Sequence, residues 1–400
     1  MPESHVVRSV YVHIPFCRRR CPYCDYAVAE LEEGGVSPWL EAIRGEWKAV
    51  TGAGGPQIGR LETLYVGGGT PSALGAEAMR GLRSLFGERL LASPGLEWTA
   101  EANPEDLTPE LAAAWRESGV NRVSLGIQSL QDDALRWLGR IHSAEEAYRA
   151  LDAALGAGIA NVNVDLALGL PEGVGHDWQA ELDRVAALRP AHVTLQEISV
   201  EPGTPLAADV EAGKERMPEP EASRDAYRRA SRVLRAAGYH HYEVSSFALP
   251  GRESRHGLAY LSGRPYVGLG NGAHSYLPPR RRWNLADWGG YCTAARDDTL
   301  SRHSTVEGEE ELSVQQARLE GLWLGLRARS GVPRDRLPPE AARLVARWIR
   351  EGYAEDDPEV VRLTGEGWLR LDHLVVELER CLPASPSDSR PISIRTRKRQ

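Results

Sequence analysis

The feature that most constrains the fold is a regular alternation of strand-like and helix-like segments in the first half of the chain. The helical segments carry their own start signals, such as the Thr108-Pro109 pair and the capping box from Ser143 to Glu146. Six strand–helix units in succession predict a parallel sheet, which is either doubly wound or curled into a barrel. The predicted strands begin near Ser9, Leu61, Leu96, Asn121, Asn161 and His192.

Polar and apolar residues alternate within these predicted strands. Glu97, Thr99 and Glu101, for example, share one face of a strand whose other face is apolar. A parallel strand covered by helices on both faces is instead a continuous apolar run. A half-exposed antiparallel sheet would alternate in the same way, but the intervening helices argue against it. We therefore expect an α/β fold in the form of a partial (β/α)6 TIM-like barrel, with a polar lumen that holds a ligand.

The alternation weakens after about residue 197, and this change sets the predicted domain boundaries. Residues 1–200 are expected to form the barrel core, and residues 201–304 to complete it. Residues 305–382 are expected to form a small helical or winged-helix unit, with helices near 309–329, 339–351 and after Thr364. Residues 383–400 are rich in Ser, Pro and Arg without periodicity, which predicts a disordered tail.

Composition narrows the functional classes. The 400 residues include 48 Lys and Arg against 56 Asp and Glu, for a net charge of −8. This balance argues against a chain that coats nucleic acid, so we expect no nucleic-acid partner. No run approaches the ~20 apolar residues that span a bilayer, and the amino terminus carries no apolar signal segment. We expect a soluble, cytoplasmic protein.

Three of the five cysteines, Cys17, Cys21 and Cys24, lie within eight residues directly after the first predicted strand. Loops at the carboxyl ends of barrel strands build active sites, and closely spaced thiolates suit zinc or an iron–sulfur cluster. No fourth Cys or His follows at zinc-finger spacing, which argues against a closed zinc site. Three thiolate ligands would leave one iron of a [4Fe–4S] cluster open.

The segment Tyr11-Val-His-Ile-Pro-Phe-Cys17, with its two following cysteines, resembles the cluster motif of the radical S-adenosylmethionine (SAM) superfamily. The nearest similarity is to the branch that contains oxygen-independent coproporphyrinogen dehydrogenases and heme chaperones, and it extends to about residue 380. The resemblance implies a [4Fe–4S] cluster on Cys17, Cys21 and Cys24 whose open iron is chelated by SAM. Reduction of the cluster then cleaves SAM to a 5′-deoxyadenosyl radical.

The resemblance also implies a set of SAM contacts at the ends of the predicted strands. A glycine run follows the second strand, and glycine allows close backbone approach to a ligand. The resemblance assigns Gly68, Gly69 and Thr70 to the SAM amino group and gives Glu101 a further contact. In the dehydrogenases some of the matching positions contact a second SAM. The remaining implied SAM residues are Tyr11, Tyr23, Gln128, Arg140 and Asp165.

Residues 254–261 depart from the pattern of the heme chaperones. Those sequences usually contain Cys-x-His-Asn followed by Tyr-Trp, whereas this chain has Ser254-Arg255-His256-Gly257 followed by Tyr260-Leu261. Neutral imidazole is a common axial heme ligand, so His256 is the predicted ligand if heme binds. A hydrogen-bonded structural histidine is the alternative interpretation of His256.

Two sequence features separate the possible functions. Asp25-Tyr26 follows Cys24, as in the chaperones, whereas the dehydrogenases have Gly-Cys there. The dehydrogenases also carry a long amino-terminal arm, and only eight residues precede Ser9 here. We predict a chaperone that binds heme and delivers it to apo-hemoproteins, including ones at the membrane surface, and that receives electrons from a low-potential donor. The alternatives are oxygen-independent coproporphyrinogen III oxidation, which decarboxylates propionates in porphyrin biosynthesis, and a radical SAM reaction on another substrate.

Overall fold

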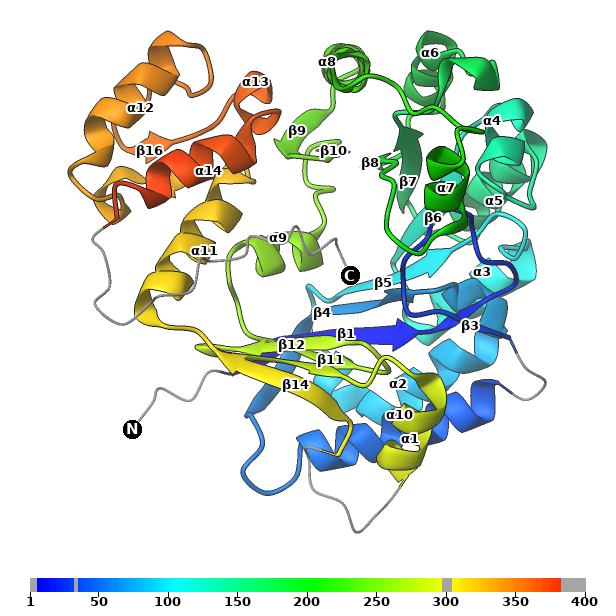
Figure 1. Cartoon of the computed structure of the whole chain (residues 1–400). Coiled ribbons are helices and arrows are strands. Elements are labelled where there is room, and N and C mark those ends of the chain that lie inside the picture. Colours follow the sequence, from blue (N-terminus) through cyan, green and yellow to red (C-terminus); the bar gives the residue numbers. More distant parts are fainter. Residues whose placement is uncertain (1–5, 32–34, 297–303, 383–400) are drawn as a thin grey trace.

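The computed structural model describes residues 6–31, 35–296 and 304–382. Its centre is a twelve-stranded sheet with the strand order β14-β13-β12-β11-β1-β4-β5-β6-β7-β8-β10-β9. The six strands predicted from the sequence lie side by side in chain order and are parallel (Figure 1), which confirms the predicted α/β class. They are β1 (Val7–Ile14), β4 (Ile58–Gly68), β5 (Glu97–Ala102), β6 (Arg122–Gln128), β7 (Asn161–Leu168) and β8 (His192–Glu197).

The register of the sheet aligns the polar faces of these strands. Glu101 lies opposite Ser124, and Ser124 lies opposite Asn163. Asn163 in turn lies opposite His192. Side chains at paired positions point to the same face of a sheet. The polar residues therefore share one face, and apolar neighbours such as Val123 are buried on the other.

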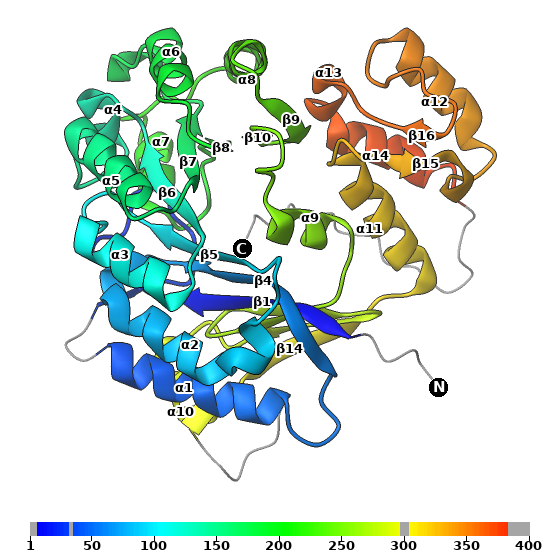
Figure 2. The same ribbon diagram turned by 180° about the vertical axis from the view of Figure 1, so that it is seen from behind.

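Helices cover the apolar face of the parallel strands, as Figures 1 and 2 show from opposite sides. Two of the predicted start signals are confirmed. Thr108 Oγ1 accepts a hydrogen bond from the Leu111 amide at 3.2 Å, and Ser143 and Glu146 form the capping box. The helices of this region are α1 (Val36–Val50), α2 (Gly75–Leu91), α3 (Pro109–Ser118), α4 (Asp132–Trp137), α5 (Ala144–Gly156), α6 (Trp178–Leu188), α7 (Pro205–Glu211) and α8 (Pro220–Ala236).

Residues 201–296 extend the sheet at both ends. Strand β10 (Ser246–Ala248) pairs antiparallel with β8 and with β9 (His240–Glu243). On the other side, β11 (Tyr266–Leu269) lies parallel to β1 and is followed by the antiparallel strands β12 (His274–Leu277) and β13 (Arg280–Asn284). Helix α9 (Arg255–Leu261) packs beside β4, and α10 (Trp288–Arg296) packs beside α1. Within the described residues the sheet ends at β14 and β9, so its hydrogen bonds do not close a barrel.

The helix predicted near residues 309–329 is wrong at its amino-terminal end. Residues Val306–Glu311 form the edge strand β14, and helix α11 begins only at Val314. Strand β14 pairs antiparallel with β13, which places Arg281 opposite Glu310 and joins them in an ion pair at 2.5 Å. Opposite charges across a strand pair stabilise the pairing, which explains why this glutamate-rich segment is extended.

The carboxyl-terminal segment has an apolar cluster of its own, with Trp348 fully buried in it. The backbone amide of Val244, next to β9, donates to the carbonyl of Arg327 at 3.0 Å and so joins this segment to the sheet edge. Division of the chain near residues 200, 304 and 382 is our proposal, and the predicted tail lies outside the described residues. Among the described residues no helix is long and apolar enough to span a membrane. The elements are α11 (Val314–Leu326), β15 (Val332–Pro333), α12 (Ala341–Arg350), β16 (Val360–Val361), α13 (Gly365–Trp368) and α14 (Leu371–Glu379).

Candidate functional site

The three closely spaced cysteines lie on one loop at the carboxyl end of β1. Cys17 ends the short strand β2 (Phe16–Cys17), which pairs with β3 (Ala29–Glu30) and so closes the base of the loop. Within it, the amide of Cys24 donates to the carbonyl of Cys21 at 3.1 Å. All three thiols are free and partly exposed. The loop therefore presents three sulfur ligands at the edge of the sheet where parallel strands end.

The donor chemistry of this loop fits an iron–sulfur cluster. Thr70 Oγ1 donates to Cys17 Sγ at 3.3 Å, and Arg140 Nη1 donates to Cys21 Sγ at 3.5 Å. Such donors stabilise thiolates and metal-bound sulfur. Burial raises the pKa of Cys17 to about 11 and raises the pKa of Cys24 as well. In the described residues no three His, Cys, Asp or Glu side chains lie close enough together to hold a metal ion.

The glycine run at the end of β4 packs tightly against the start of the cysteine loop. The amide of Gly69 donates to the carbonyl of Ile14 at 2.6 Å. Gly68 has a φ of +110°, and a Cβ there would lie 2.3 Å from Nδ1 of His13. A Cβ on Gly67 would lie 2.7 Å from the carboxylate of Glu101. Glycine is therefore required here for close approach to groups of the protein itself.

Glu101 connects this run to the polar face of the sheet. Its carboxylate accepts hydrogen bonds from the Tyr65 hydroxyl at 2.6 Å and from the Gly68 amide at 3.0 Å. Burial raises the pKa of Glu101 to about 7, and the nearby carboxylate of Asp165 contributes to the rise. A ligand ammonium group only donates hydrogen bonds, so the groups that could bind it here are carboxylate and carbonyl oxygens.

Asp165 belongs to a hydrogen-bonded network across the four strands β6, β7, β8 and β9. It accepts hydrogen bonds from Ser124 at 3.2 Å and from Asn163 at 2.8 Å. The Oδ1 of Asn163 lies 2.6 Å from Nδ1 of His192, whose Nε2 lies 2.8 Å from the Tyr242 hydroxyl. The polar face predicted from the sequence is thus a lumen whose side chains largely satisfy one another.

The other predicted SAM residues lie on β1, in the cysteine loop, at the end of β6 and in the segment after α4. The Tyr11 hydroxyl lies 3.0 Å from His13 Nδ1, and burial raises the pKa values of Tyr11 and Tyr23. Gln128 ends β6 with a φ of +66°, and its buried Oε1 has no hydrogen-bond partner in the described residues. A non-glycine residue with a left-handed backbone conformation is uncommon, and such residues cluster at functional sites. This amide oxygen is therefore free to accept a hydrogen bond from a ligand.

His256 lies at the opposite end of the lumen. Its Nδ1 is 2.9 Å from Thr63 Oγ1 and its ring packs against Tyr65, while burial lowers its pKa to about 4. The Glu97 carboxylate accepts from its backbone amide at 3.0 Å and so holds the start of α9 in the barrel. The space beside the ring leaves no room even for a water molecule, whereas ligand pockets measure ~300–1,000 Å³. That His256 binds heme iron stays a prediction, and in this arrangement its ring is a packed part of the lumen floor.

A larger hollow, of about 430 Å³, lies on the outer helical layer between α2 and α3. Charges of both signs line it, including Arg80, Arg83, Glu88 and Glu117. It contains none of the residues predicted to carry chemistry, and its mixed charge favours no particular ligand.

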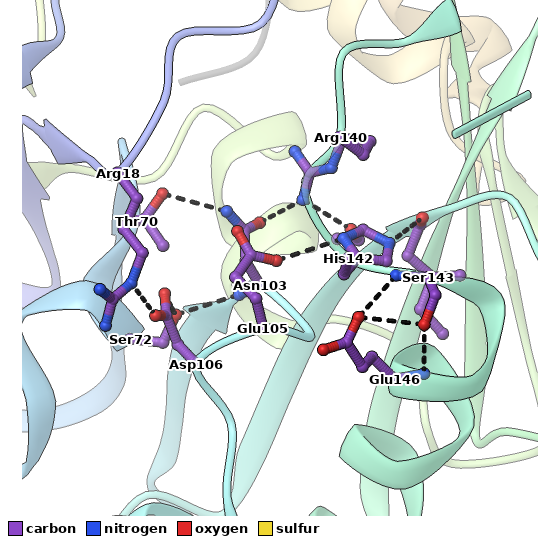
Figure 3. Close-up of polar contacts among 12 residues, drawn as sticks. Arg18, Thr70, Ser72, Asn103, Glu105, Asp106, Arg140, His142, Ser143 and Glu146 are labelled. Carbon is purple, nitrogen blue, oxygen red and sulfur yellow. Dashed lines mark hydrogen bonds and ion pairs between the residues drawn. The ribbon is translucent and has the colours of Figure 1, made fainter. Parts of the chain in front are cut away.

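Sequence reasoning assigned no role to the residues that follow β5. Asn103 donates to Thr70 Oγ1 at 3.3 Å and accepts from Arg140 Nη2 at 2.6 Å, as Figure 3 shows. Glu105 Oε2 lies 3.2 Å from His142 Nδ1. A cue was present in the sequence, because Asn103 continues the alternate polar positions that end with Glu101.

These features define a class: a parallel α/β sheet that carries three cysteines in the loop after its first strand and a polar site at the strand ends. The family model of the radical SAM superfamily matches residues 11–185. The heme chaperone HemW of Mycobacterium tuberculosis is 36% identical over 373 residues, which cover 92% of this chain and 93% of that protein. HemW of Bacillus subtilis is 32% identical, with coverage of 91% and 97%. The chain belongs to the radical SAM superfamily and, within it, to the HemW branch.

A solved structure supports the fold. Coproporphyrinogen III oxidase (HemN) of Escherichia coli superposes with a TM-score of 0.78 at 21% sequence identity, over 95% of this chain and 91% of that one. At this identity the likeness concerns the fold alone.

Proposed function

We propose that this protein is a heme chaperone of the HemW type, which binds heme and passes it to apo-hemoproteins. The observation that carries the proposal is the similarity to curated heme chaperones along nearly the whole chain, at 36% and 32% identity. Asp25-Tyr26 after Cys24 supports it, because the dehydrogenases have Gly-Cys at those positions. Recipients at the membrane surface, a low-potential electron donor and a cytoplasmic location are further parts of the proposal.

Cys17, Cys21 and Cys24 would hold a [4Fe–4S] cluster, which would bind SAM and supply the electron for its reductive cleavage. The chain's own groups bind and orient SAM. Glu101 and the carbonyl oxygens of the Gly68–Thr70 run accept hydrogen bonds from its ammonium group. The remaining SAM contacts are proposed for Tyr11, Tyr23, Gln128, Arg140 and Asp165.

The proposed heme ligand is His256. Its Nδ1 lies against Thr63, so Nε2 is the nitrogen that would bind iron. Heme is far larger than the cavity beside this ring, so its binding requires α9 to move away from β4. The Ser254 hydroxyl accepts from the Gly257 amide at 3.2 Å and caps this helix. The segment that must move is thus the seven-residue helix α9, whose amino-terminal end is held by this cap.

Heme binding and heme transfer test the proposal directly. The full chain is reconstituted anaerobically with iron and sulfide, titrated with hemin and followed by absorption spectroscopy. The loaded protein is then mixed with apomyoglobin as a model recipient. We expect saturable binding, transfer to the recipient and an altered heme spectrum in His256→Ala. His373→Ala is the matched control, because His373 is exposed on α14.

The same preparation separates the alternative functions. With SAM and a reductant, a chaperone leaves coproporphyrinogen III unchanged. Conversion to protoporphyrinogen IX would establish the oxidase instead. If neither heme binding nor porphyrinogen conversion is seen, the chain acts on another radical SAM substrate.

A further inference from the structure

Asn103 lies one position beyond the end of β5, and its side-chain amide contacts two other segments at once. Nδ2 donates to Thr70 Oγ1 at 3.3 Å, and Oδ1 accepts from Arg140 Nη2 at 2.6 Å (Figure 3). Each of these partners also donates to a cysteine sulfur, Thr70 to Cys17 at 3.3 Å and Arg140 to Cys21 at 3.5 Å. Five side chains thus form one hydrogen-bonded arc that links two of the cysteines.

The position of Asn103 is fixed by its own backbone contacts. Its amide donates to Ser72 Oγ at 3.0 Å, and Ser72 donates to the Asp106 carboxylate at 3.0 Å. The Asp106 side chain is only 1% exposed and forms an ion pair with Arg18 of the cysteine loop. The backbone amide of Asp106 donates to the carbonyl of Asn103 at 3.1 Å. The segment after β5 is therefore anchored both to the glycine run and to the cysteine loop.

The two arms of the Asn103 amide determine where the sulfur donors point. A threonine hydroxyl has one hydrogen, and because Thr70 Oγ1 accepts from Asn103, that hydrogen is directed toward Cys17. The second arm holds the Arg140 guanidinium, which the carbonyl of Gly126 also fixes at 2.9 Å. Hydrogen bonds and positive charge at cluster sulfurs stabilise the reduced, more negative state and raise the reduction potential.

We propose that Asn103 is a positioning residue that holds the Thr70 hydroxyl and the Arg140 guanidinium on the two cysteine sulfurs and thereby raises the reduction potential of the cluster. The role rests on the proposed function, in which Cys17 and Cys21 ligate that cluster. It requires a donor and an acceptor on one short side chain. Aspartate supplies only the acceptor, and leucine, of similar size, supplies neither.

The test measures the cluster potential and does not depend on turnover. Wild type, Asn103→Leu and Asn103→Asp are reconstituted in the full chain, and their midpoint potentials are determined by spectroelectrochemical titration. We expect both variants to take up iron and to have a more negative potential. Asn121→Leu is the matched control, because Asn121 bridges β5 and β6 at the opposite end, with contacts to Trp98 and Leu96. Its potential should equal that of wild type.

Double variants identify the route of the effect. If Asn103 acts through Thr70, the shift in Asn103→Leu/Thr70→Val is smaller than the sum of the two single shifts, and Thr70→Ser retains the wild-type potential. A loaded Asn103→Leu protein with an unchanged potential, or additive shifts, would overturn the role of Asn103. If the leucine variant does not fold, the same comparison of midpoint potentials is made with Asn103→Asp, Thr70→Val and their double variant. A wild type that assembles no cluster would overturn the proposed function together with this role.

Discussion

The raised pKa of Glu101 makes folding stability depend on pH, and Glu101→Gln removes that dependence. Burial moves the pKa from its ordinary value of 4.5 to about 7. The folded chain therefore binds this proton more tightly than the unfolded chain does. The stabilisation that Glu101 contributes to the free energy of unfolding is therefore lost as pH rises from about 4.5, and the loss is complete above pH 7. Glutamine keeps the size and the acceptor oxygen but has no proton to lose.

The size of the effect follows from the shift. At 1.36 kcal/mol per unit, the change from 4.5 to about 7 corresponds to about 3 kcal/mol. This figure is an upper limit, because Glu101 keeps part of its surface exposed to solvent. We expect Glu101→Gln to gain stability relative to wild type as pH rises from 5 to 8, approaching that limit.

The assay is denaturant unfolding of the metal-free chain at pH 5, 6, 7 and 8, followed by fluorescence of the 11 tryptophans. Other buried carboxyls, such as Glu46, are present in both proteins and cancel in the difference. Glu145→Gln, at an exposed position of α5, is the control for the loss of a charge. A stability difference that stays constant with pH, or that changes in favour of wild type, would refute the buried-carboxyl argument.

Three further predictions concern single residues. Gly68→Ala should lower the melting temperature much more than Gly75→Ala, because both have a positive φ but only Gly68 has neighbours where the Cβ would lie; equal losses would show that strain alone matters. Thr108→Ala should cost about 1 kcal/mol of unfolding free energy by removing the cap of α3, and Thr108→Ser should restore it in the same melt. Glu101→Ala should weaken SAM binding to the reconstituted protein by about 1–3 kcal/mol, and unchanged affinity by calorimetry would remove Glu101 from the site.

Local periodicity explains what could be predicted. The alternation in β5 and β6 is set by which face each side chain occupies, so it reports the polar lumen directly from sequence. The caps at Thr108 and Ser143 depend on residues three positions away and were equally visible. The cysteine loop was predictable because its three cysteines lie within eight residues of the chain.

Features that depend on distant partners could not be predicted. Glutamate is a good helix former, so local propensity favours a helix before Val314, yet pairing with β13 keeps this segment extended. The floor position of His256 depends on Glu97, more than 150 residues earlier in the chain. The contacts of Asn103 likewise join segments that only the folded sheet brings together.

The central claim is that Cys17, Cys21 and Cys24 hold one cluster with an open iron that binds SAM. The most direct measurement is the electron paramagnetic resonance spectrum of the reduced, anaerobically reconstituted protein before and after addition of SAM, together with iron and sulfide analysis. We predict about four irons and four sulfides per chain, a spectrum that changes when SAM binds, and loss of the signal when the three cysteines are replaced by alanine. A zinc-loaded protein without iron, or a cluster whose spectrum does not change when SAM is added, would contradict the account.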